Sequence, residues 1–157
     1  MKRVNTIIIS AILIGLFLGG CATTQHLATP SGKPEVIINT TDRWKIKSVI
    51  INEFMNAGFT MISESDYGVV FSKPMKGVGG VMYQALLGSP YSSSPEWNAR
   101  INMATTSDST RVVAQAVAKM QNAFGREDVN DMTSGKPGVQ LQEILQRIKV
   151  QVEAAAR

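Results

Sequence analysis

Few side chains in this sequence belong to the types that carry out covalent chemistry. The only histidine is His26 and the only cysteine is Cys21. Both precede the part of the chain that we expect to fold, so the domain is not expected to hold a Ser-His-Asp or Cys-His arrangement. The same scarcity argues against a zinc site of the cysteine and histidine kinds. The sequence therefore predicts a protein that is not an enzyme and carries no metal and no cofactor.

Carboxylates alone can hydrolyse a glycosidic bond, because one acts as an acid and the other as a base or nucleophile. The candidates are Glu64, Asp66, Glu127, Asp128 and Asp131. Acidic residues of this kind are common in solvated turns, where they support the turn and do no chemistry. We therefore keep a carboxylate-dependent glycan hydrolase only as a remote alternative.

Three ligand-binding motifs begin in this sequence and are not completed. The glycine-rich residues 76–80 would need a further glycine where Met82 stands to bind a dinucleotide. A Walker loop fails because Pro137 follows the Gly-Lys pair. A calcium loop starting at Asp128 fails because Thr133 occupies the position of the required glycine. None of the three predicts a site.

The N-terminus carries the clearest signal for location. Lys2 and Arg3 precede an almost wholly apolar run over residues 7–18. A membrane-spanning helix needs roughly 20 apolar residues, and this run is shorter. A charged start, an apolar run and small residues at the end are typical of a secretion signal, so we expect residues 1–20 to be a signal peptide. Its removal halves the formal net charge of +4, which leaves little to favour a nucleic-acid partner.

The segment Leu18-Gly19-Gly20-Cys21 resembles the lipobox of bacterial lipoproteins. In that family the cysteine thiol receives a diacylglyceryl group, the leader is cut before the cysteine, and the new amino group is acylated. The resemblance implies that Cys21 is the lipidation site. Several acyl chains hold a protein on a membrane far more firmly than one. Because Ala22 and not aspartate follows the cysteine, the resemblance also implies attachment to the outer membrane with the domain facing the periplasm.

The rest of the chain predicts a tether and one folded domain. Residues 21–34 contain the lipidated cysteine and are rich in Thr, Ser, Gly and Pro, which is typical of a flexible tether. Residues 35–157 have the length and composition of a single domain. Within it, residues 35–39 form a β-rich run, and residues 43–57 repeat apolar side chains at helical spacing before Gly58.

Four further strands and a second helix follow. Residues 59–64 and 67–73 flank a turn and predict a hairpin. Residues 97–104 and 111–120 alternate in polarity as half-buried strands do, and a strong helical stripe begins at Val139. The order strand, helix, four strands, helix predicts an α+β fold, with two helices packed on one face of an antiparallel sheet. This order resembles the helix-grip modules of BamC-like lipoproteins, a component of the outer-membrane assembly machinery.

The connection over residues 74–96 is much longer than the about 2 to 5 residues of a hairpin loop. Two interpretations remain open for it. One is a short helix over residues 81–87 that packs as a cap on the sheet edge. The other is a lid over an apolar pocket or a docking loop, whose contacts would be Met82, Tyr83, Leu86 and Tyr91.

The remaining conspicuous side chains have ordinary explanations. Trp44 and Trp97, each at the start of a predicted element, are expected to cover the edges of the core. Arg43, Lys45 and Lys47 are expected to form a solvated face of the first helix.

Taken together, the sequence predicts a membrane-anchored envelope lipoprotein whose domain is a non-catalytic protein-binding or scaffolding module. The expected partners are the membrane, through acylated Cys21, and another envelope protein. The alternative is a domain that binds a lipid or another apolar ligand between its helices and its sheet, with residues 74–96 as the lid.

Overall fold

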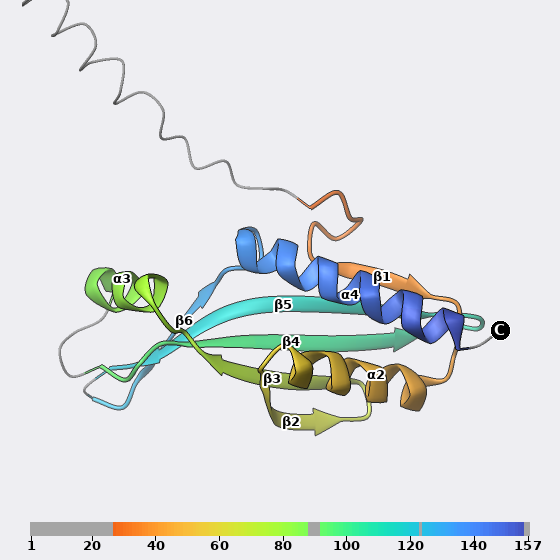
Figure 1. Ribbon diagram of the computed structural model, residues 1–157, viewed down its shortest axis with the longest axis horizontal. Helices are drawn as coiled ribbons and strands as arrows, with labels where there is room; N and C mark the ends of the chain where they lie inside the picture. The colour runs from red at the N-terminus through yellow and green to blue at the C-terminus, as the bar shows by residue number, and fades with distance from the viewer. Residues whose placement is uncertain (1–26, 88–91, 123, 156–157) are drawn as a thin grey trace, which may run out of the picture.

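The computed structural model describes residues 27–87, 92–122 and 124–155 as one α+β domain (Figure 1). Its sheet is antiparallel, with the strand order β1-β5-β4-β3-β2, and β6 also pairs with β5. The helices α2 and α4 lie side by side on one face of this sheet. The elements in chain order are β1 (Glu35–Ile38), α2 (Arg43–Asn56), β2 (Thr60–Ser65), β3 (Gly68–Pro74), α3 (Val78–Leu87), β4 (Glu96–Thr105), β5 (Thr110–Gln121), β6 (Glu127–Asp131) and α4 (Lys136–Ala154).

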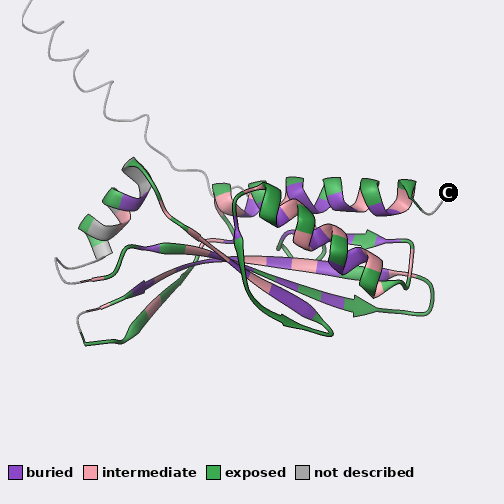
Figure 2. Cartoon of the chain, turned by 60° about the horizontal axis from the view of Figure 1, so that its bottom comes forward, coloured by how far each residue is buried: buried purple, intermediate pink, exposed green. Residues whose placement is uncertain are grey.

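The expected architecture of an antiparallel sheet with two helices packed on it is confirmed. The core lies between the helices and the sheet (Figure 2). Burial recurs at helical spacing in α2 and α4 and alternates along much of β4 and β5, whereas β2 is exposed throughout. Alanines on β4 and β5 leave room for the larger side chains of the helices above them. The core residues include Ile46, Ile50 and Phe54 of α2; Leu141, Ile144, Leu145, Ile148 and Val152 of α4; and Val69, Phe71, Ala99, Ile101, Met103, Val112, Ala114 and Ala116 of the sheet.

Both ends of α2 are fixed by short-range hydrogen bonds. At its start, the Asp42 side chain accepts a hydrogen bond of 3.0 Å from the backbone N–H of Lys45. At its end, Gly58 has a φ of +80°, and the N–H of Phe59 reaches back 3.0 Å to the carbonyl of Phe54. Glycine adopts this left-handed conformation without steric cost, so the chain can leave the helix and enter β2.

The strand β6 and the exact start of α3 differ from what the sequence predicted. Residues 127–131 were expected to lie in solvated turns, but they form β6, an edge strand along the second half of β5. Strands are poor in Asp and Asn, so these residues gave no strand signal. The helix α3 confirms that the long connection holds a helix, although it starts at Val78 and not at residue 81.

Two expectations about the first helix were wrong. Trp44 does not cover the core edge, since 73% of its surface is exposed. Lys47 is not solvated: it is 4% exposed, and its ammonium group donates to Glu64 at 3.0 Å and to the carbonyl of Ser65 at 2.7 Å. The alkyl stem of a lysine can pack on apolar neighbours, so helical periodicity does not reveal which cation will be buried.

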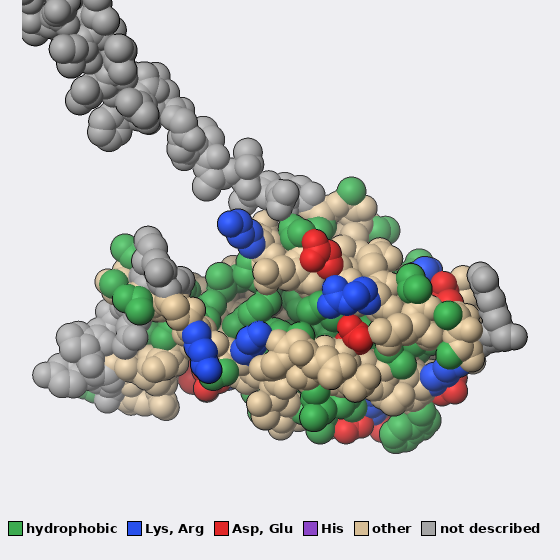
Figure 3. Space-filling model, in the orientation of Figure 1, with side chains coloured by type: hydrophobic (Ala, Val, Ile, Leu, Met, Phe, Trp, Pro, Cys, Tyr) green, Lys and Arg blue, Asp and Glu red, His purple; other side chains and the backbone are tan. Residues whose placement is uncertain are grey.

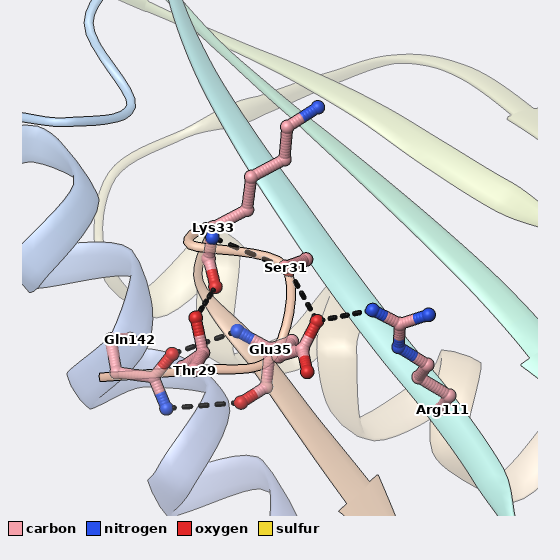
Figure 4. Close-up of polar contacts among 6 residues, drawn as sticks. All are labelled: Thr29, Ser31, Lys33, Glu35, Arg111 and Gln142. Atoms are coloured by element: carbon pink, nitrogen blue, oxygen red, sulfur yellow. Dashed lines mark hydrogen bonds and ion pairs between the residues drawn. The ribbon is translucent and has the colours of Figure 1, made fainter. Parts of the chain in front are cut away.

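The N-terminal strand is joined to α4 and β5 through Glu35 (Figure 4). Its backbone N–H donates to the Gln142 side chain at 2.8 Å, and its carbonyl accepts from the same amide at 3.1 Å. Its carboxylate accepts hydrogen bonds from the Ser31 hydroxyl and from the Arg111 guanidinium. The residue is 7% exposed, so this junction is a buried polar link between three elements.

The Glu35 junction makes stability depend on pH. Burial raises the pKa of the Glu35 carboxyl, but the hydrogen bonds from Ser31 and Arg111 and the charge of Arg111 outweigh it, so the pKa lies below its ordinary value of 4.5. A carboxylate of this kind stabilises the fold fully above its unfolded pKa, and that contribution is lost as the pH falls through the folded pKa. We expect the free energy of unfolding, measured with urea, to differ most between the wild type and Glu35→Gln near neutral pH. The difference should become smaller below pH 4.5. If this difference in unfolding free energy did not decrease in acid, the ionised Glu35 carboxylate would not be the group that stabilises the junction.

Candidate functional site

A cleft lies at one end of the domain, between the helix layer and α3. Figure 1 shows α3 beyond the ends of α2 and α4, where β3 and β5 end and β4 begins. The cleft has a volume of about 620 Å³, within the range of about 300 to 1,000 Å³ that is usual for small-molecule sites. In the space-filling view it is a hollow with hydrophobic side chains inside and basic side chains at its margin (Figure 3).

The walls of the cleft come from four separate parts of the chain. The end of α2 contributes Gly58, the loop before α4 contributes Met132, and β4 contributes Trp97. The remaining wall is formed by the end of β3 and by α3, and its residues are Lys73, Pro74, Met75, Lys76, Gly80 and Tyr83. The lining is mainly apolar, so it is suited to an apolar group.

A row of aromatic rings connects the cleft to the core. Phe54 stacks on Phe71 with ring centroids 4.6 Å apart, and its other neighbour, Phe59, meets it edge to face at 5.4 Å. Phe59 in turn meets Trp97 at 5.0 Å. Because the first three rings are buried and closely packed, they hold the indole that forms one wall of the cleft in a fixed position.

The helix α3 is attached to the domain at defined points. The N–H of Met75 donates to the carbonyl of Pro95 at 3.0 Å, which carries the β3–β4 pairing one step beyond the strands. The Tyr83 hydroxyl accepts a hydrogen bond of 2.6 Å from the Asn130 amide on β6. At Gly80 a Cβ would lie 2.3 Å from the Met75 carbonyl oxygen, so only glycine permits this close approach. These contacts position Tyr83 in the cleft wall.

The charged residues that line the cleft are both lysines. The ammonium group of Lys73 donates to the carbonyl of Ala57 at 2.7 Å and lies 5.3 Å from the centre of the Phe59 ring. Lys76 is exposed, and its side chain makes no hydrogen bond or ion pair with the described residues. Both charges in the described lining are therefore positive.

The indole of Trp97 lines the cleft with its apolar ring and not with its N–H. The Nε1 atom is fully buried and makes no hydrogen bond within the described residues. Because a fully buried nitrogen is not exposed to the cleft, the cleft wall at Trp97 is apolar.

The sequence-predicted contact residues take different positions. Tyr83 lines the cleft, whereas Leu86 is 76% exposed on the outside of α3. Met82 belongs to α3, but its side chain lies outside what the structure describes, as do Tyr91 and Cys21. Sequence reasoning missed Gly58, Lys73 and Met132, because nothing in the local sequence indicates that segments so far apart share one cleft.

Three of the five acidic candidates, Glu64, Glu127 and Asp131, have structural partners. Glu64 pairs with Lys47, and Glu127 pairs with Lys119 at 2.8 Å. Burial raises the pKa of the Asp131 carboxyl, but hydrogen bonds from Thr133 and Gln115 outweigh this and lower the pKa. These contacts support β2, β6 and the loop before α4.

In residues 27–87, 92–122 and 124–155, no group of His, Cys, Asp and Glu side chains could hold a metal ion. Within the same ranges, every helix is too short or too polar to traverse a bilayer. Comparisons with known proteins found no match to the chain among family models, curated proteins or solved structures.

Proposed function

We propose that the protein is a lipid-anchored envelope protein whose periplasmic domain binds an apolar ligand in the cleft beside α3. The observation that carries this proposal is the cleft itself, about 620 Å³ of mainly apolar space that ends on Trp97. The long connection supports it, because it supplies part of one wall of the cleft through Gly80 and Tyr83. Catalysis forms no part of the proposal, and Glu64, Glu127 and Asp131 are engaged in contacts within the fold.

The anchor is tested at Cys21. Cys21→Ser should abolish lipidation, because the hydroxyl replaces the thiol that would be alkylated, and should leave an uncleaved or mislocalised product. Metabolic labelling with a clickable fatty acid in a bacterial host measures this directly, with Ala22→Ser as a matched control that keeps the thiol. Equal incorporation into the wild type and Cys21→Ser would contradict the lipoprotein assignment.

The ligand site is tested by removing α3. The hydrogen bond between Met75 and Pro95 brings the ends of the connection together, so a short Gly-Ser turn can replace residues 76–94. We expect binding of an apolar fluorescent probe to be lost, because the cleft wall that α3 forms disappears. Stability should change little, because loop-closure entropy depends only weakly on length.

The binding assay can use a chain that begins at residue 27. This chain retains the hydrophobic core and the hydrogen bonds that the structure describes. Leu86→Ser on the exposed side of α3 is the matched control and should leave probe binding unchanged. Unaltered probe binding after replacement of residues 76–94 would overturn the proposed site. A large drop in melting temperature would instead identify α3 as a packed cap on the sheet.

The outer surface of α3 favours a second candidate, a docking site for another envelope protein. Val81 and Leu86 are 68% and 76% exposed, although both are apolar. Exposed apolar residues on one element are typical of protein-binding sites when they form a patch. Photocrosslinking from position 86 in cells tests it, and a specific adduct that is lost in Val81→Ser would support it.

A further inference from the structure

We infer that the ligand of the cleft is a single-chain amphiphile with an anionic headgroup, bound with its chain along the apolar walls and its headgroup at Lys76. This inference rests on the proposed function and specifies its ligand. It depends on two features of the cleft: the apolar interior and the cations at the margin.

The interior of the cleft fits a hydrocarbon chain. Trp97, Met132 and Pro74 present apolar surface from three different elements, and Met75 extends it toward α3. Methionine side chains adapt to ligands of variable shape. The cleft is open at one side (Figure 3), so one end of a ligand can remain in water while the other is covered.

The charges at the margin select the headgroup. Both charged lining residues are lysines, and they differ in their surroundings. Lys73 is occupied by the Ala57 carbonyl and the Phe59 ring, whereas Lys76 is exposed and has no hydrogen bond or ion pair with the described residues. Lys76 is therefore the cation available to an anion, and Lys73 adds a second positive charge from a fixed position.

The apolar walls and the exposed cation together define the ligand class. An uncharged hydrocarbon would contact the walls and make no use of Lys76. An amphiphile can place its chain on the walls and its anionic headgroup beside the Lys76 ammonium group. The combination of apolar walls and an available cation therefore favours an anionic amphiphile over an uncharged hydrocarbon.

The test compares two probes that share one hydrocarbon chain and differ in the charge of the headgroup. A dansyl-labelled undecanoic acid and its methyl ester share the same chain, and transfer of indole fluorescence to the dansyl group reports binding near Trp97. The measurements use the chain from residue 27 with Trp44→Phe, so that Trp97 is the only donor. We expect the acid to bind about fivefold more tightly than the ester, which corresponds to one well-placed ion pair at an exposed margin.

Charge reversal at Lys76 provides the decisive variant. In Lys76→Glu the preference for the acid should disappear or invert, while affinity for the ester stays the same. Lys45→Glu is the matched control, because it makes the same change in net charge at the other end of α2 and should keep the preference. The preference of the parent chain should also weaken with added salt.

Each outcome has a definite meaning. Equal binding of acid and ester, or a preference that survives Lys76→Glu, overturns the anionic ligand and leaves the proposed apolar site standing. Failure of both probes to bind a folded domain overturns the site as well and points to a protein side chain as the occupant of the cleft. Loss of the preference in Lys45→Glu would show a long-range effect of net charge and would also overturn the role of Lys76.

Discussion

Gly138→Ala is expected to destabilise the domain by about 3 kcal/mol, although alanine is the better helix former. Gly138 lies in the first turn of α4, where an added Cβ would come 1.7 Å from the carbonyl oxygen of Thr133. That carbonyl cannot retreat easily, because the Thr133 side chain is bound to both the N–H and the carbonyl of Ala116 in β5. Any side chain at position 138 would therefore clash with the backbone that joins the sheet to the start of α4.

Urea unfolding followed by circular dichroism measures this loss, and the melting temperature should fall by roughly 10 °C in a domain of this size. Gly135→Ala is the matched control, because it adds the same methyl group three residues earlier. Its nearest neighbour, the Cδ of Pro137, would be 3.5 Å away, and its backbone is extended with a φ of −112°. We expect a change below about 1 kcal/mol there. Equal stability of the two variants would refute the close packing at Gly138.

Phe54→Ala is expected to lower the free energy of unfolding by about 3 to 5 kcal/mol. The ring is fully buried and contacts both Phe71 and Phe59, so its removal opens a cavity where α2 meets the sheet. Because Phe59 also supports Trp97, the cleft should lose its fixed wall, and probe affinity should fall together with stability.

The matched control for Phe54 is Phe124→Ala, the same chemical change at a side chain that is 95% exposed. It should alter the free energy of unfolding by less than about 0.5 kcal/mol. Phe54→Leu retains much of the volume and should lose less stability, which keeps the binding measurement accessible if Phe54→Ala does not fold. A small effect of Phe54→Ala would contradict the central place of the aromatic row.

The parts of the fold that the sequence predicts correctly are the elements in which apolar residues recur at a regular spacing. Ile46, Ile50 and Phe54 recur at helical spacing, and Ala114 and Ala116 alternate along a strand, so periodicity alone places them in the core. The edge strand β6 has no such pattern. It exists because β5 offers it hydrogen bonds, which is a property of the partner and not of residues 127–131.

The candidate site was predictable only in its location. An unusually long connection indicated that residues 74–96 do more than join two strands, and Tyr83 does lie in the cleft wall. Trp97 was expected at the core edge, and it is half-buried there while it also lines the cleft. The contribution of Gly58 and Met132 depends on how helices and strands pack, and no single stretch of sequence contains that information.

The arrangement of β1 bears on the order in which the domain assembles. This strand pairs with the first residues of β5, and Gln142 of α4 holds its first residue, so both partners come from the C-terminal half of the chain. A long loop must close before any of these hydrogen bonds can form, whereas β4 and β5 are joined by a short turn. Local pairs are entropically cheaper to form, so we expect the β4–β5 hairpin to form before β1 docks. Among the described strands, the first to be synthesised is accordingly expected to be among the last to dock.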